Sequence, residues 1–160
     1  MLKRFATLVI SVSLLVSLAP SATALESFPG DGKRVVYSRS EHRVWLINAD
    51  GSLSGTWKVT GNPTIPALGT YRIYSKSAVT RSVNGQWLFT HMVRFARTKK
   101  GIGVGFHSIP VSTRTRAPIM PLDKIGAPGY QSHGCVRQSK ADAERMWAWA
   151  TIGTKVVVLK

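Results

Sequence analysis

The sequence predicts a mainly β protein of one domain, a β-sandwich or barrel, with one short helix near the C-terminus. Short apolar runs separated by Gly-, Pro- and Asn-containing turns occupy most of the chain, which is typical of a β-rich domain. A helical spacing of apolar residues appears after residue 139. The chain has 160 residues, 44% of them hydrophobic and 18% charged. This length suits a single domain with a hydrophobic core.

Residues 1–24 have the features of a secretory signal peptide. Lys3 and Arg4 precede an apolar run of 15 residues at 5–19, and small residues follow at 22–24. The run is short against the roughly 20 residues that a membrane-spanning helix needs, although a membrane anchor is the alternative. We therefore expect cleavage before Leu25, export, a catalytic or binding domain at 25–160, and no stable membrane insertion after cleavage.

The first half of the mature chain predicts a series of strands. They are expected at 35–37, 43–47, 53–60 and 69–74. The pair Asp50-Gly51 marks a hairpin turn between the second and third. Residues 61–66 contain two prolines, which lack the N–H group that a central strand needs, so this segment is predicted to be a loop.

Next, Asn84-Gly85 predicts a tight turn before a long strand at 87–97. In that strand Met92, Arg94 and Ala96 share one face, and Val93, Phe95 and Arg97 share the other. A turn at 99–101 leads into an apolar strand that ends in a histidine, His107. Gly101, Gly103 and Gly105 alternate along it, so one face is bare and another backbone or a substrate can approach closely, or the strand bends there.

The C-terminal third predicts a loop, a helix and a last strand. The segment 110–131 has four prolines and no clear period, which indicates a long surface loop. Ser139 followed by Asp142 predicts a helix start, and Ala143, Met146, Trp147 and Ala150 then share one face. Packing of Trp147 onto the sheet is favoured over ligand stacking. Residues 154–159 form the last strand.

The charge balance favours a polyanionic partner. The chain carries 22 Lys and Arg against 7 Asp and Glu, a net charge of +15. Removing Lys3 and Arg4 leaves 20 basic residues against the same 7 acidic ones, or +13. Such a protein should adhere to polyanions. Nucleic acid is excluded as a partner because export separates the protein from it and no nucleic-acid-binding motif is present.

Cys135 is the only cysteine, so no internal disulfide can form. It lies in a Ser-His-Gly-Cys-Val-Arg hexapeptide at 132–137, and these neighbours favour a reactive thiol over a buried, inert one. His107 is the candidate base. Zinc binding by His107, His133 and Cys135 is disfavoured because the usual zinc-ligand spacings are absent, and no metal site is predicted.

These motifs resemble those of the L,D-transpeptidases, the YkuD-like family, whose pattern is a histidine, a spacer and then Ser/Thr-His-Gly-Cys with an apolar residue. Residues 66–71 are similar to the family's Pro-x-x-Gly-x-aromatic turn, and 103–107 to its histidine strand, so the resemblance covers 35–159. The spacer of 24 residues at 108–131 is longer than that of other members. Arg137 stands where many members carry Asn and others Arg.

The resemblance implies a YkuD-like fold and covalent acyl transfer without cofactor. Cys135 would be the nucleophile and His107 the proton acceptor and donor, with the Ser108 carbonyl fixing the imidazole tautomer. The amides at 133–135 would form an oxyanion hole. Ser132, His133 and Gly134 are therefore predicted to form or support this hole, together with Ser108. The substrate-binding residues are predicted as Arg137, Tyr130 and Phe106. Two alternatives stay open for His133, which either holds the loop through hydrogen bonds or carries a proton. Arg137 either binds a substrate carboxylate or ties the loop through its backbone carbonyls.

The function expected from these features is a secreted peptidoglycan L,D-transpeptidase, monomeric and located at the cell wall. Its partners would be peptidoglycan stem peptides and anionic wall polymers. A tetrapeptide stem would donate the acyl group, releasing terminal D-Ala, to an amine of a neighbouring stem. The alternatives are an L,D-carboxypeptidase or other wall-peptide hydrolase, and a non-catalytic basic wall-binding module.

Overall fold

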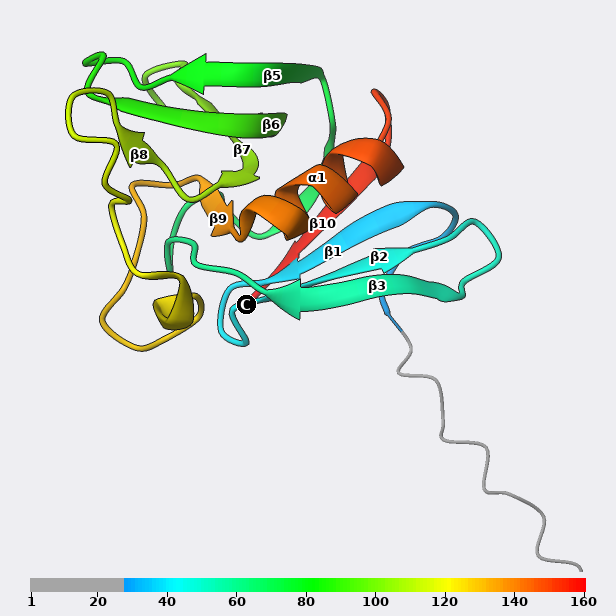
Figure 1. Ribbon diagram of the computed structural model, residues 1–160. Coiled ribbons are helices and arrows are strands. Elements are labelled where there is room, and N and C mark those ends of the chain that lie inside the picture. Colours follow the sequence, from blue (N-terminus) through cyan, green and yellow to red (C-terminus); the bar gives the residue numbers. More distant parts are fainter. Residues whose placement is uncertain (1–27) are drawn as a thin grey trace, which may run out of the picture.

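The protein is built from two β-sheets, as the computed structural model of residues 28–160 shows (Figure 1). The first sheet has the strand order β3 (Leu53–Lys58), β2 (Arg43–Ile47), β1 (Arg34–Ser38), β10 (Lys155–Leu159) and β4 (Gly69–Arg72). The second has the order β5 (Ser75–Arg81), β6 (Trp87–Arg97), β7 (Gly103–Ser108) and β9 (Val136–Gln138), with β8 (Val111–Ser112) paired to β6. The predicted mainly β class is confirmed. The predicted signal peptide at 1–24 lies outside the described residues.

Two parallel pairs tie together segments that are distant in sequence. β1 pairs in parallel with β10, and β7 pairs in parallel with β9. The other paired strands are antiparallel, and the predicted turns at Asp50-Gly51 and Asn84-Gly85 join β2 to β3 and β5 to β6. Both turn glycines have positive φ, +86° and +71°, as such tight turns require.

The main hydrophobic core lies between the two sheets. Alternate residues of the strands point into it, which is the period-2 pattern of a strand with one buried face. Its strand members include Val35, Tyr37, Val44, Leu46, Val93, Phe95, Val104, Phe106, Val156 and Val158. Phe95 and Phe106 stack with ring centroids 4.8 Å apart, so β6 and β7 are also locked to each other through their side chains.

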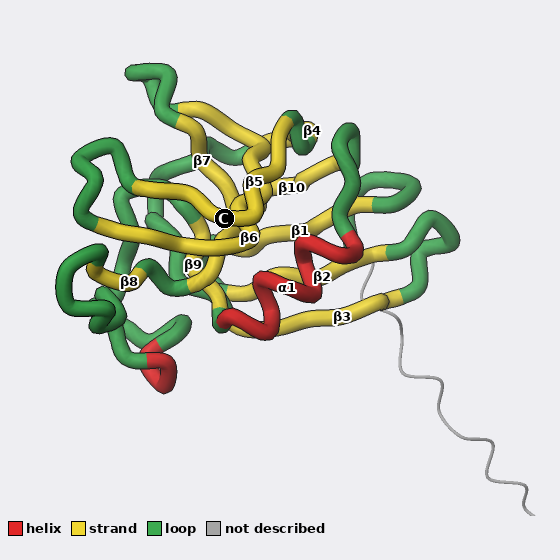
Figure 2. Tube along the Cα trace, turned by 45° about the horizontal axis from the view of Figure 1, so that its top comes forward, coloured by secondary structure: helices red, strands yellow, loops and turns green. Residues whose placement is uncertain are grey.

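The helix α1 (Lys140–Trp149) lies beside the strands of both sheets (Figure 2). Its start is as predicted, because the Ser139 side chain accepts a hydrogen bond from the Asp142 N–H and satisfies one free donor of the first turn. At the other end, Lys76 of β5 donates to the carbonyls of Trp147 and Ala150 and lies over the Trp147 ring. Trp147 is partly buried against the core. No helix within residues 28–160 is long and apolar enough to cross a bilayer.

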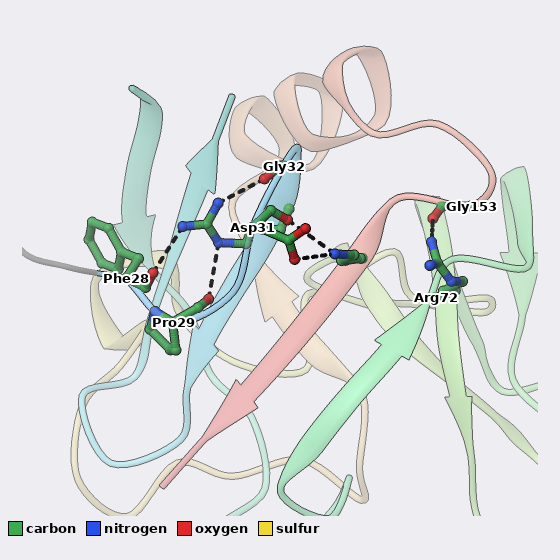
Figure 3. A network of polar contacts seen from close by, with 8 residues as sticks. Phe28, Pro29, Asp31, Gly32, Arg72 and Gly153 are labelled. Atoms are coloured by element: carbon green, nitrogen blue, oxygen red, sulfur yellow. Dashed lines mark hydrogen bonds and ion pairs between the residues drawn. The ribbon is translucent and has the colours of Figure 1, made fainter. Parts of the chain in front are cut away.

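The segment that enters β1 is held by one buried arginine. Arg34 donates to the carbonyls of Phe28, Pro29 and Gly32 at 2.7–3.0 Å (Figure 3). Lys155 of β10 pairs with Asp31 in the same turn. These contacts hold the segment at 28–32 against β1 and β10 of the first sheet.

Five elements differ from the sequence prediction. The strand β5 was not predicted, and the predicted strand at 69–74 ends at β4, after which the chain crosses to the second sheet. The predicted loop at 110–131 contains β8 and a 3-10 helix, η1 (Leu122–Lys124). β9 lies inside the cysteine motif. All five are short or polar, so neither length nor apolar alternation revealed them.

Gly105 marks the closest approach of two strands. A Cβ atom built at Gly105 would lie 2.2 Å from the Val93 carbonyl oxygen, far inside contact distance. The pairing of β6 with β7 shifts register between Arg94 and Ala96, which indicates a bulge at this point. The bare glycine face predicted for this strand therefore admits a neighbouring backbone and brings β7 tightly against β6.

We predict that Gly105→Ala destabilises the protein by roughly 3 kcal/mol or more, because backbone atoms cannot rotate away from the added methyl group. Chemical denaturation followed by circular dichroism measures the loss. Gly55→Ala is the control, since a Cβ there meets only side-chain atoms of Trp57 and Arg145, the nearest at 3.2 Å. It should cost about 1 kcal/mol or less. Equal costs would contradict the close approach.

Candidate active site

His107 is fixed in one tautomer by its own backbone neighbour. It ends the apolar run of β7 and its side chain is buried, with 3% exposed. Nδ1 lies 2.6 Å from the Ser108 carbonyl oxygen, and because a carbonyl only accepts, Nδ1 carries the proton. Nε2 of the neutral ring therefore holds the free lone pair. This is the orientation that a general base requires.

The hydroxyl of Ser108 holds the peptide that orients the imidazole. Ser108 Oγ accepts from the Thr90 N–H at 2.9 Å and from Thr90 Oγ1 at 3.1 Å. The Phe89 ring packs over His107 with centroids 4.2 Å apart and planes 31° apart. β6 thus restrains both the ring and the carbonyl to which it donates.

Burial lowers the pKa of His107 to about 4. The hydrogen bond to Ser108 opposes this shift, while the positive charges of Arg137 and Arg94 add to it. A histidine is ordinarily half-protonated near pH 6.5. The lowered pKa keeps His107 neutral well below that pH, so the base is ready to accept a proton.

The cysteine loop is folded around the Ser132 side chain. Ser132 Oγ accepts from the Gly134 N–H at 3.0 Å and donates to the Cys135 carbonyl. The loop is anchored from outside by the bonds of Ser132 N–H to the Gly61 carbonyl and of Asn62 Nδ2 to the Ser132 carbonyl. Gly134 has a φ of +140°, and a Cβ there would lie 2.8 Å from Ile65 Cγ2. Glycine is required at this position.

The predicted oxyanion hole needs a correction. The Gly134 N–H already donates to Ser132 Oγ, so it belongs to the loop and does not point to a substrate. The amides of His133 and Cys135 are the candidates that the loop leaves for this role. Ser132 and Gly134 hydrogen-bond within the loop that carries Cys135.

Cys135 lies half-buried at the end of β9, with Sγ 3.8 Å from the Gly103 carbonyl oxygen. Burial raises the pKa of the thiol, whereas the Gly105 backbone and the charges of Arg137 and Arg94 act in the opposite direction. At neutral pH the resting pair is therefore a neutral thiol and a neutral imidazole. A thiol in this state needs a base to take its proton if it is to act as a nucleophile, and His107 lines the same pocket.

Arg137 is largely buried, with 8% exposed, and joins the two sheets. Its backbone exchanges two hydrogen bonds of 2.8 Å with Thr60, which follows β3. Its Nη1 donates to the Gln131 carbonyl at 3.3 Å. The structure thus places one side of the guanidinium on a loop carbonyl, while the residue also lines the pocket.

The other predicted residues fall in different places. His133 is exposed and lines the pocket, so the structure leaves both of its predicted roles available. Tyr130 is half-buried and does not line the pocket. The prediction of Phe106 as a substrate-binding residue is wrong, because its ring has no exposed surface and packs against Tyr37 and Phe95 in the core. Strand alternation turns it away from the site.

One pocket of about 590 Å³ contains Cys135 and His107. The β5–β6 hairpin, β7 and the cysteine loop line it. From the long segment after β7, Pro110 and Ile119 reach it; the tip at 113–118 does not, and Thr113 N–H bonds to the Gln86 carbonyl of the hairpin turn. Within residues 28–160 no three His, Cys, Asp or Glu side chains gather into a metal site.

Two lining residues were missed by the sequence analysis. Phe89 packs on His107, and Arg94 lies beside Gly103. The signal for Arg94 was present, because the predicted alternation placed it on one strand face with apolar residues, and a charged residue on an apolar face needs a reason. In the structure Met92 lines the pocket with Arg94, whereas the bulge in β6 turns Ala96 into the core, so the predicted face is wrong for Ala96. Phe89 gave no such signal.

The site as a whole brings a thiol and a neutral imidazole into one pocket. His107 lies on β7 and Cys135 lies just before β9, the strand that pairs with β7 in parallel. A family model described as the YkuD L,D-transpeptidase catalytic domain matches residues 32–158. This chain belongs to that family. No curated protein sequence matches it.

Solved L,D-transpeptidase structures share this fold. The enzyme of Stackebrandtia nassauensis has a TM-score of 0.60 and 22% identity, over 82% of this chain and 57% of its own. The L,D-transpeptidase of Mycobacterium smegmatis has a TM-score of 0.58 and 22% identity, over 82% of this chain and 60% of its own. L,D-transpeptidase 3 of Mycobacterium tuberculosis, in complex with a faropenem-derived adduct, has a TM-score of 0.55 and 22% identity, over 82% of this chain and 61% of its own. The chain thus spans about three fifths of the length of these L,D-transpeptidases.

The neutral resting pair predicts a distinctive pH profile for thiol alkylation. Because burial raises the pKa of Cys135, iodoacetamide should react with the folded protein more slowly at pH 7 than with N-acetylcysteine, and the rate should keep rising through the alkaline range. Cys135 is the sole cysteine, so intact-mass measurement reports it alone. A fast plateau already present at pH 5–7 would indicate a thiolate–imidazolium pair instead.

Proposed function

We propose that this chain is a secreted peptidoglycan L,D-transpeptidase that acts through a Cys135 thioester. The observation that carries the proposal is the presence of Cys135 and His107 in the lining of one pocket, with the imidazole tautomer set by the Ser108 carbonyl. Membership of the L,D-transpeptidase family supports the same chemistry.

The first half-reaction forms the thioester. Sγ of Cys135 attacks the carbonyl carbon of the donor stem at its L,D bond, and the thiol proton passes to Nε2 of His107. The amides of His133 and Cys135 stabilise the developing oxyanion. Collapse breaks the C–N bond, and the departing D-Ala amine takes the proton from His107.

The second half-reaction moves the acyl group to an amine. The acceptor amine attacks the thioester carbonyl and gives a proton to His107, and the C–S bond breaks. Cys135 leaves as a thiolate and recovers the proton from His107. If water replaces the amine, the same steps release a shortened stem, which is the carboxypeptidase alternative.

A direct test is incubation of the protein with a disaccharide tetrapeptide. We expect an acyl-enzyme mass on Cys135, release of D-Ala, and dimer exceeding tripeptide when acceptor is present. Cys135→Ser should abolish cross-linking, and His107→Ala should lower the rate by about 10²-fold or more. His133→Ala is the control, and inactivity of that variant beside an active His107→Ala would overturn the base assignment. If the product is mostly tripeptide, the hydrolase alternative is favoured. If Cys135 is not acylated at all, the non-catalytic wall-binding module is favoured.

Export to the wall is part of the proposal. It is supported by the signal features at 1–24 and by the charge of +13 that remains after Lys3 and Arg4 are removed, which suits anionic wall polymers. We expect the secreted protein to begin at Leu25. Intact-mass measurement decides this, and a chain that retains residues 5–19 would instead be anchored.

A further inference from the structure

The lining of the pocket is positively charged. Arg81, Arg94 and Arg137 contribute to it, and no Asp or Glu does. The three arginines differ in setting. Arg81 is exposed at the end of β5, and Arg137 is tied to the Gln131 carbonyl, whereas Arg94 is half-buried in the middle of β6.

Hydroxyl groups hold Arg94 in place. Its Nη1 donates to Ser77 Oγ at 2.7 Å and to Ser75 Oγ at 3.5 Å, and its Nη2 donates to Thr80 Oγ1 at 3.3 Å. These partners lie on β5. They fix the direction of the guanidinium and leave its charge uncancelled, since no ion pair within residues 28–160 includes Arg94.

Gly103 leaves room for the Arg94 side chain. A Cβ atom at Gly103 would lie 3.0 Å from Arg94 Cδ and 3.3 Å from Arg94 Nε, so the arginine occupies the space that a side chain would fill. The carbonyl oxygen of the same glycine lies 3.8 Å from Cys135 Sγ. Gly103 therefore has the Arg94 side chain and the thiol as neighbours.

The Arg94 guanidinium is half-buried, and within residues 28–160 its charge has no anionic partner. An anion brought by the substrate would supply one. The planar guanidinium suits a carboxylate, with which it forms two parallel hydrogen bonds. Arg94 is thus restrained and charged, and it lines the same pocket as Cys135.

We propose that Arg94 binds a carboxylate of the acyl donor next to the scissile bond, so that the pocket selects donors with a free carboxylate over their carboxamides. This inference rests on the proposed function. Two carboxylates of a donor stem lie close to the scissile carbonyl. One is the C-terminal carboxylate of the leaving D-Ala, and the other is the side-chain carboxylate of a diamino acid that carries one.

Binding to a Cys135→Ala protein tests the proposal without turnover. Three tetrapeptide donors are compared by calorimetry: the free acid, the C-terminal carboxamide and the side-chain carboxamide. With Arg94 present, one of the amides should bind roughly tenfold to a hundredfold more weakly than the free acid, as expected for loss of a charged hydrogen bond. Which amide it is identifies the carboxylate.

The Arg94→Gln change, added to the same protein, should reduce this discrimination to about twofold or less. Arg97→Gln is the matched control, because Arg97 is the exposed end of the same strand and does not line the pocket. It should keep the full discrimination. Ser77→Ala removes the shortest bond to Arg94 and should reduce the discrimination partly, which provides a second variant if Arg94→Gln does not fold.

The proposal is overturned if the free acid and both amides bind with equal affinity to the protein that keeps Arg94, or if none of them binds measurably. It is also overturned if Arg94→Gln lowers the affinity for all three donors by the same factor. A thioester mass on the Cys135 enzyme is scored separately. The two proposals can therefore fail separately. Acylation without discrimination between acid and amide contradicts only the role of Arg94, and discrimination without acylation contradicts only the transpeptidase activity.

Discussion

The parallel pairing of β7 with β9 is the constraint on which the site depends. It sets His107 opposite Arg137 and brings Cys135 to the end of the neighbouring strand, although 27 residues separate the histidine from the cysteine. Parallel neighbours cannot be joined by a tight turn and need a long crossover. The segment 108–131, with β8 and η1, is that crossover, so its length has a structural reason before any role over the site.

The strand β9 also connects the two sheets through hydrogen bonds. β9 is only three residues long, yet its central residue also exchanges two backbone bonds with Thr60 beyond β3. Trp57 of β3 adds a side-chain bond of 2.7 Å to Gln138. β9, which follows Cys135 directly, is thereby attached to both sheets.

The sequence was sufficient for those features that have local causes. Turn glycines, apolar alternation and the Ser139 cap predicted most strands and the helix, and the histidine and cysteine motifs predicted two side chains that share one pocket in the structure. Features with non-local causes were missed. β5 is polar and is a strand because β6 pairs with it, and Phe106 faces the core because of a register that its neighbours set. The use of the Gly134 N–H by Ser132 is likewise a product of the folded loop.

The Ser132 side chain has a consequence for how this position can vary over evolutionary time. Its hydroxyl accepts from one amide and donates to one carbonyl of the same loop. A one-carbon side chain that can do both must end in a hydroxyl, and threonine is the other residue with that group at the same reach. Only serine and threonine would therefore keep both bonds at this position. The requirement comes from the loop's own hydrogen bonds.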